Sequence, residues 1–157
     1  MIILATIADA KSIANILVET WKTGFGGIVK PEDSIRDISF FEDIMEKNIF
    51  ESIENISVNR SNDIITGFIS VIDQFPSLKI KGLYILPEFQ RKGIGKSLLM
   101  HVLSWAKNEG FNSAYLNTLK GADNNTFYLN HGFVIDDNFT LQIGENDYPG
   151  VKFTKRL

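Results

Sequence analysis

The sequence predicts a mixed α/β domain. Runs of β-branched and aromatic residues alternate with stretches whose apolar residues recur at helical spacing. Two strand patterns, 79–86 and 113–119, enclose the clearest helical pattern, which predicts a right-handed parallel crossover. The chain has 157 residues, 44% hydrophobic and 22% charged, which is typical of one domain spanning residues 1–157.

The N-terminal part of the chain is expected to form one strand and two helices. A strand over 2–7 precedes a helix that begins after Asp9, a residue type favoured at N-caps, and ends at the glycine-rich segment 23–27. Pro31 opens a second helix. The buried stripe expected for that helix consists of Ile35, Ile38, Phe41, Ile44 and Met45.

Strand patterns fill most of the remaining chain. They cover residues 56–58, 64–72, 79–86, 113–119, 133–135, 139–143 and 151–155. The first two flank a polar turn and predict a hairpin. Further helices are expected over 93–108 and 123–130, ended by Gly110 and Gly132.

Composition excludes several classes of protein. The chain has no cysteine, so it has no disulfide scaffold, thiolate metal site or cysteine nucleophile. Its two histidines, His101 and His131, are too few for a histidine metal cluster, and no metal cofactor is expected. The net charge of −3, the lack of a signal-peptide pattern and the lack of a long apolar run predict a cytoplasmic protein without nucleic-acid or membrane partners.

Charge is distributed unevenly along the chain. Residues 30–63 carry nine acidic and four basic side chains, whereas residues 79–107 carry six basic side chains and one acidic one. The basic stretch predicts an anionic ligand near the helix over 93–108. For the acidic stretch, a solvated face is the alternative to a site for a cationic ligand.

The turn that opens the helix over 93–108 is the most informative segment. Backbone N–H groups at the start of a helix lack internal partners and lie at the positive end of its dipole. Gly93 and Gly95 remove side chains where an oxygen-rich ligand must approach the backbone. Positive charge is supplied by Arg91, Lys92 and Lys96. The turn therefore predicts a phosphate cradle.

Three known cradle patterns can be compared with this turn. A dinucleotide-binding fingerprint requires a glycine where Leu98 stands, and a Walker A loop requires one where Gln90 stands. The third pattern, Gln/Arg-x-x-Gly-x-Gly/Ala, binds a pyrophosphate and is met by Gln90, Gly93 and Gly95.

With these motifs the sequence resembles the GNAT superfamily of N-acetyltransferases. The resemblance covers most of the chain and rests on the Leu-Tyr-Ile strand at 83–85, the cradle, and Phe-Tyr-x-x-x-Gly-Phe at 127–133. Trp21 and the loop 27–32 look like the family's first-helix region. The resemblance implies a GNAT-like fold, in which helices flank a mostly antiparallel central sheet. It also implies an enzyme that transfers acetyl from acetyl-CoA directly to a primary amine.

The resemblance also implies where acetyl-CoA binds. The pyrophosphate would lie on the backbone amides of 91–96, and the pantetheine arm would add like a strand in a gap beside 113–119. A strand amide, at Tyr84 or Ile85, would donate to the thioester oxygen. The implied cofactor-binding residues are Leu83, Tyr84, Ile85, Gln90, Arg91, Lys92, Gly93, Ile94, Gly95 and Lys96.

Tyr128 stands where the family places its general-acid tyrosine, and a core tyrosine is the alternative interpretation. No general base is assigned, because Lys79 occupies the position of the family's glutamate. A cofactor-contacting asparagine is replaced by Gly121. The residues that could substitute for it are Asn117, Asn124 and Asn125.

The acceptor is expected to be a small-molecule amine or a protein amine. Trp21 and Phe25 would border its pocket, although core packing is the alternative for Trp21. Two rival functions stay open: a non-catalytic CoA-binding regulatory module, and a nucleotide hydrolase that uses Gly95-Lys96-Ser97. The sequence leaves the oligomeric state open, a homodimer included.

Overall fold

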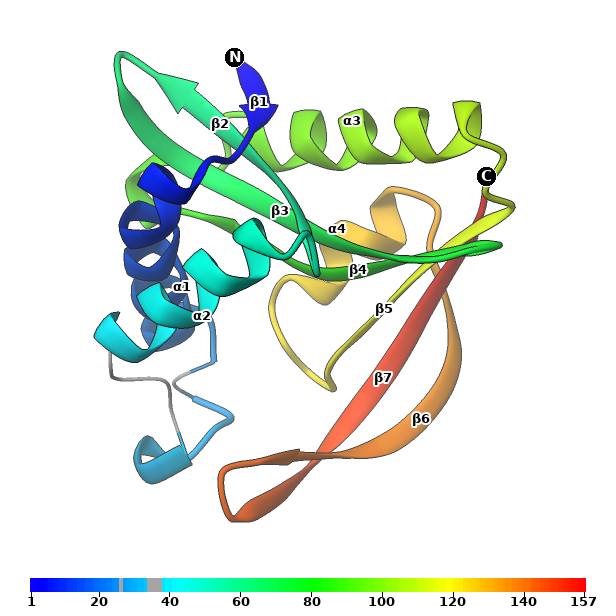
Figure 1. The fold of residues 1–157 in the computed structure, drawn as a ribbon. Coiled ribbons are helices and arrows are strands. Elements are labelled where there is room, and N and C mark those ends of the chain that lie inside the picture. Colours follow the sequence, from blue (N-terminus) through cyan, green and yellow to red (C-terminus); the bar gives the residue numbers. More distant parts are fainter. Residues whose placement is uncertain (26, 34–37) are drawn as a thin grey trace.

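A computed structural model describes residues 1–25, 27–33 and 38–157. Seven strands form one mixed sheet in the order β1-β2-β3-β4-β5-β7-β6, with helices on both faces (Figure 1). β4 and β5 are parallel, and every other neighbouring pair is antiparallel. The predicted fold class is therefore confirmed.

The elements have the following bounds. The strands are β1 (Ile2–Leu4), β2 (Asn55–Ser61), β3 (Ile64–Gln74), β4 (Ser77–Ile85), β5 (Ser113–Leu119), β6 (Val134–Ile143) and β7 (Asn146–Arg156). The helices are α1 (Ala10–Gly24), α2 (Ile38–Phe50), α3 (Ile94–Asn108) and α4 (Asn125–Asn130), with short 3-10 helices η1 (Ile7–Asp9), η2 (Pro31–Asp33) and η3 (Pro87–Phe89). None of the helices in the described ranges has the length and apolar character of a membrane span.

The predicted N-terminal strand ends early, at Leu4, because a capped turn follows. The Thr6 N–H and hydroxyl both donate to Asp9 Oδ2, at 2.9 and 3.1 Å. Asp9 precedes α1 as predicted, yet its carboxylate serves this turn and Arg60 (2.5 Å) rather than the N–H groups of α1. Burial raises the pKa of Asp9, but the hydrogen bonds from Thr6 and Arg60 and the charge of Arg60 together lower it below its ordinary value.

Two other predicted boundaries are wrong. The strands predicted over 133–135 and 139–143 are one strand, β6. Its register shifts between Ile135 and Asp137, so Asp136 is an extra residue that forms a bulge. Pro31 opens only η2, and α2 begins at Ile38. The stripe position Ile35 and the loop residue Gly26 lie outside the described residues.

Two hydrophobic cores hold the helices against opposite faces of the sheet. α3 and α4 cover one face, where Leu98 and Leu99 share a buried core with Ile69 in β3. α1 and α2 cover the other, where Ile13 belongs to the same core as Phe68. Each fully buried large apolar side chain contributes about 1.5–3 kcal/mol. The sheet is therefore fixed from both sides, which gives any site at its centre rigid walls.

β4 and β5 are paired over only three residues. Their pairing runs from Ser77 with Ser113 to Lys79 with Tyr115. Beyond this point β4 continues beside β3 while β5 pairs with β7, so the two strands diverge (Figure 1). The gap predicted between these strands is thus present, at the centre of the sheet.

Candidate active site

A cavity of about 500 Å³ lies at the divergence of β4 and β5. Its walls come from the C-terminal part of α1, from β4, from the turn into α3 and from the N-terminal side of α4. Ten of the eleven residues proposed from the sequence line it: Leu83, Tyr84, Ile85, Gln90, Arg91, Gly93, Ile94, Gly95, Lys96 and Tyr128. The exception is Lys92, whose Nζ lies 5.2 Å from the centre of the Phe89 ring.

The β4 main chain presents free polar groups to the cavity. The Leu86 N–H donates to the Thr66 carbonyl of β3 at 2.9 Å. Because hydrogen-bonded and non-bonded pairs alternate along an antiparallel ladder, Leu83 and Ile85 direct their N–H and C=O groups away from β3. These groups face the gap left by β5. The Ile85 carbonyl already accepts a hydrogen bond from the Gln90 side chain, so the Ile85 N–H and both groups of Leu83 are free to pair with a ligand that carries amide groups. Of the two amides proposed as donors, Tyr84 and Ile85, only that of Ile85 faces the gap.

The N-terminus of α3 forms the second wall of the cavity. The first intrahelical bond runs from Ser97 N to Gly93 O at 3.0 Å, so the three preceding N–H groups lie free at the positive end of the helix. The cationic side chains of Arg91 and Lys96 line the cavity beside them. Gln90 Nε2 donates to the Ile85 carbonyl at 3.0 Å and so ties the turn to β4.

The two cradle glycines serve different purposes. Gly93, the N-cap of α3, has φ +81°, a backbone conformation that glycine adopts without strain. Gly95 lies in the helix, and the side-chain atoms nearest to a Cβ added there would be those of Phe127 at 3.7 Å and Ile85 at 3.8 Å. The turn therefore favours glycine at Gly93, whereas at Gly95 a Cβ would fit at ordinary contact distances.

Tyr128 is both a core residue and a cavity residue. It is 3% exposed, with ring centroids 5.8 Å from Phe133 and 5.9 Å from Phe153, and it also lines the cavity. Burial raises the pKa of its phenol, and the nearby Tyr84 raises it further. The hydroxyl therefore stays protonated and available as a donor.

Tyr84 lines the cavity from the α1 side of β4. Its ring lies against Gly82, where an added Cβ would overlap the ring atoms. Burial raises the pKa of Tyr84, the indole N–H of Trp21 opposes this by donating to the phenol oxygen, and the charge of Glu54 raises the pKa further. Trp21 does not line the cavity itself; it supports Tyr84 and packs in the core, whereas Phe25 is in the lining.

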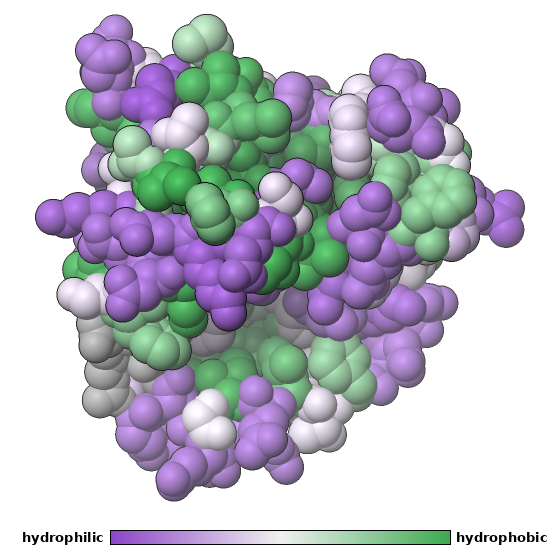
Figure 2. All heavy atoms as spheres, in the orientation of Figure 1, coloured by the Kyte–Doolittle hydropathy of each residue, from purple (hydrophilic) through white to green (hydrophobic). Residues whose placement is uncertain are grey.

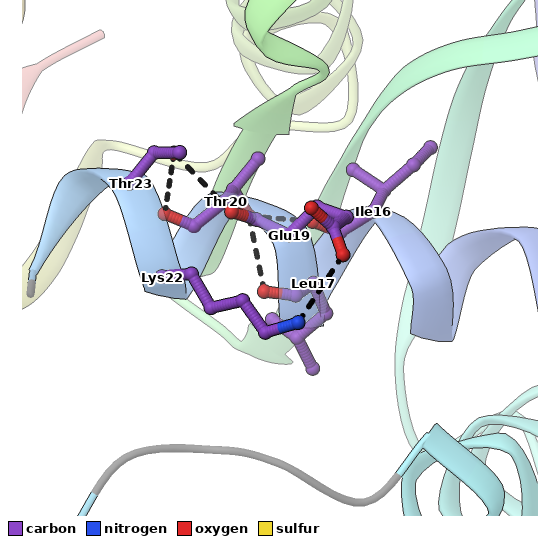
Figure 3. Close-up of polar contacts among 6 residues, drawn as sticks. All are labelled: Ile16, Leu17, Glu19, Thr20, Lys22 and Thr23. Atoms are coloured by element: carbon purple, nitrogen blue, oxygen red, sulfur yellow. Dashed lines mark hydrogen bonds and ion pairs between the residues drawn. The ribbon is translucent and has the colours of Figure 1, made fainter. Parts of the chain in front are cut away.

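The α1 wall offers hydrogen-bond acceptors. Thr20 and Thr23 lie one turn apart and both line the cavity. The Thr20 hydroxyl donates to Ile16 O at 2.7 Å, and that of Thr23 donates to Glu19 O at 3.2 Å (Figure 3). Because each hydroxyl proton is used within the helix, the lone pairs are what remain for a ligand. Nothing in the sequence pattern distinguished these threonines from other helical residues.

Several proposed residues can now be placed. Lys79 lies in β4 where this strand pairs with both β3 and β5. Among the described residues, the carboxylate that lines the cavity is that of Asp123. The acidic stretch 30–63 contributes none of the described lining residues. Asn124 lines the cavity, whereas Asn125 Nδ2 donates to the Leu119 carbonyl at 3.0 Å. No cluster of three potential metal ligands occurs within the described ranges.

A family model described as an acetyltransferase (GNAT) domain matches residues 52–135, which is more than half of the chain. The chain belongs to this GNAT family. A spermidine N(1)-acetyltransferase from Thermoplasma acidophilum is 24% identical over 140 residues, covering 84% of this chain and 86% of that protein.

Solved structures share the fold of this GNAT domain. The PaiA N-acetyltransferase of Thermoplasma acidophilum, in complex with coenzyme A, has a TM-score of 0.78 at 20% identity and covers 100% of this chain and 98% of its own. A GCN5-related N-acetyltransferase from Rhodopseudomonas palustris has a TM-score of 0.80 at 17% identity, with coverages of 100% and 95%. The resemblance inferred from the motifs is confirmed.

In this GNAT domain Lys30 and Asp33, which follow α1, are hydrogen-bonded to the β6–β7 hairpin. Asp33 accepts hydrogen bonds from the Tyr148 hydroxyl (2.6 Å), the Asn146 side chain (2.8 Å) and the Glu145 N–H (3.2 Å). The Lys30 N–H donates to the Tyr148 oxygen at 3.0 Å. On this face the surface is hollowed between α1, α2 and the hairpin, with apolar residues in the hollow and polar ones around it (Figure 2).

The hydrogen bonds of Asp33 to the β6–β7 hairpin should weaken in acid, because they depend on an ionised carboxylate. The hydrogen bond from Tyr148 lowers the pKa of Asp33 below its ordinary 3.8; burial opposes this, and Asn146, the Glu145 amide and Lys30 lower it further. A lowered folded-state pKa means that the contribution is present above pH 3.8 and is lost as pH falls through the folded value. We expect Asp33→Asn to be less stable than the wild type at neutral pH, with a smaller further loss below pH 4. Thermal unfolding between pH 7 and 2 measures this, and parallel curves for the two proteins would contradict it.

Proposed function

We propose that this GNAT domain transfers the acetyl group of acetyl-CoA to a primary amine by direct attack. The observation that carries the proposal is the convergence of three features on one cavity: free backbone groups of β4, the open N-terminus of α3, and the buried phenol of Tyr128. The first two suit an amide-bearing arm and a diphosphate, and the third suits a leaving sulfur.

The cradle fits the diphosphate of coenzyme A. The N–H groups of Ile94, Gly95 and Lys96 would bind its oxygens, with the Arg91 side chain beside them. A Cβ at Gly93 would meet nothing within 4 Å, so the approach to the backbone is open. The pantetheine arm would pair with Leu83 and Ile85 in the gap between the strands. The resulting path leads from the helix to Tyr128.

Bound acetyl-CoA supplies an acetyl group activated on sulfur. The Ile85 N–H would donate to the carbonyl oxygen as negative charge develops there during attack by the neutral amine. The Tyr128 hydroxyl would give its proton to the leaving sulfur. Burial disfavours a thiolate as it disfavours a phenolate, so the departing sulfur in this cavity is a stronger base than in water. No side chain is proposed as the base that deprotonates the amine.

The α1 wall supports an amine as the acceptor. An amine brings N–H donors, and the lone pairs of Thr20 and Thr23 are acceptors that match them. The carboxylate of Asp123 adds negative charge to the same cavity. The similar protein from Thermoplasma acidophilum acts on spermidine, so spermidine is the first acceptor to test.

The two threonines give a direct test of acceptor binding. We expect Thr20→Val combined with Thr23→Val to raise the KM for the amine about tenfold, because each substitution removes an acceptor and keeps the side-chain shape. The KM for acetyl-CoA should not change. An equal rise in both KM values would contradict this assignment.

Release of free thiol from acetyl-CoA in the presence of an amine panel tests the function itself. We expect release with at least one primary amine, and calorimetry should show a preference for coenzyme A over ATP. Tight binding of coenzyme A without thiol release for any amine would favour the regulatory module. A preference for ATP would contradict the proposal.

A further inference from the structure

Glu54 is a buried carboxylate that the proposed mechanism does not use. It lies just before β2, on the face of the sheet covered by α1 and α2, and it is 4% exposed. Burying a carboxylate is unfavourable unless charged and polar partners compensate for the lost water. The groups that bind the Glu54 carboxylate therefore indicate its role in the fold.

Three elements supply those partners. Asn48 in α2 donates to Glu54 Oε1 at 2.7 Å, and Ser70 in β3 donates to Oε2. Lys81 in β4 forms an ion pair with Oε1, although its own side chain is 47% exposed. Glu54 thus joins α2, β3 and β4 through one carboxylate.

The β4 partner stands at an irregular point of the ladder. Ser70 pairs with Gly82 and Val71 pairs with Ile80, so Lys81 is an extra residue in β4, a β-bulge. A bulge bends its strand and increases the local twist. Glu54 therefore forms its ion pair with Lys81, the residue at which β4 bends.

The bulge separates the two functional parts of β4. The last residue of β4 paired with β5 is Lys79, and the first residue with free groups facing the cavity is Leu83. Directly after the bulge, Gly82 makes room for the Tyr84 ring. The direction of β4 along the cavity therefore depends on the segment between Lys79 and Leu83, which contains the partner of Glu54, Lys81.

We propose that Glu54 is a positioning residue that fixes the bulge at Lys81 and so aligns Leu83 and Ile85 with the pantetheine arm of the cofactor. The proposal rests on the proposed function, because it assumes that this arm binds along β4. A positioning role predicts different effects on two kinds of ligand, whereas a general loss of folding would affect both equally. Loss of the ion pair should weaken ligands that carry pantetheine and spare ligands that occupy only the helix N-terminus.

Calorimetry with two ligands tests this. The ligands are coenzyme A and 3′-phosphoadenosine 5′-diphosphate, which is coenzyme A without its pantetheine arm. We expect Glu54→Gln and Lys81→Met to raise the Kd of coenzyme A about tenfold, because small displacements of a binding segment are costly. The Kd of the nucleotide should stay unchanged. Lys81→Arg keeps the cation and should bind coenzyme A as the wild type does.

The matched control is Arg60→Met, which breaks a second ion pair of a buried carboxylate, between Asp9 in η1 and Arg60 in β2. This variant should unfold at a lower temperature yet bind both ligands normally. Unchanged coenzyme A binding in folded Glu54→Gln, or equal loss of both ligands, would overturn the inference. If Glu54→Gln does not fold, Lys81→Met, altered at a half-exposed position, decides between these outcomes. A wild type that binds neither ligand would contradict the proposed function instead.

Discussion

Replacing Tyr128 with phenylalanine is expected to lower kcat about 100-fold while leaving the Kd of coenzyme A unchanged. The substitution removes one hydroxyl and keeps the ring, which packs against Phe133 and Phe153. General acid catalysis contributes about 10²–10⁴-fold, and the lower end suits a thiol, which is a moderately good leaving group. Steady-state kinetics together with calorimetry measures the two quantities separately.

The pH profile of the wild type provides a second measurement of the same role. Because burial raises the pKa of Tyr128 above its ordinary value of 10, the phenol remains protonated throughout the range in which the acceptor amine loses its proton. We expect kcat/KM to rise with pH and to show no decline below pH 10. Tyr115→Phe is the matched control, since Tyr115 lies outside the cavity lining, and its kcat should equal that of the wild type. A decline near pH 8 that persists in Tyr128→Phe would assign the acid to another group.

The parts of the site that were predictable from sequence are those made by consecutive residues. The turn from Gln90 to Ser97 carries its glycines, its charges and its helix start within one short segment, so its chemistry can be inferred locally. The parallel crossover was also predictable, because β4, α3 and β5 follow one another and each has the right periodicity.

What the sequence could not predict depends on contacts between distant residues. Glu54 is one of many acidic residues in its stretch, and only its position beneath the bulge at Lys81 distinguishes it. Thr20 is recognised as a candidate site residue only because it lines the same cavity as the β4 residues. Gly93 and Gly95 belong to one motif. Their purposes are separated only by the left-handed backbone of Gly93 and by the contacts that a Cβ at Gly95 would make with Phe127 and Ile85.

That difference between the glycines gives the second large expected effect. Gly95→Leu should raise the Kd of coenzyme A about 100-fold without lowering the melting temperature. A Cβ at Gly95 would lie at ordinary contact distances from Phe127 and Ile85. All three residues line the cavity, so a longer side chain at this position should occupy space proposed for the cofactor. Leucine also favours the helix over glycine by up to about 1 kcal/mol, which helps to keep the fold intact.

Two substitutions by alanine distinguish an effect on coenzyme A binding from an effect on the stability of the turn. Gly95→Ala fits the Gly-x-Gly/Ala pattern and should keep coenzyme A binding. Gly93→Ala should instead cost about 1–2 kcal/mol of unfolding free energy, because φ is +81° there and a Cβ is strained whatever space surrounds it. Calorimetry and thermal unfolding of the three variants distinguish these effects. If Gly95→Leu binds coenzyme A normally, the diphosphate does not lie at the start of α3, and the cradle serves only to turn the chain from β4 into the helix.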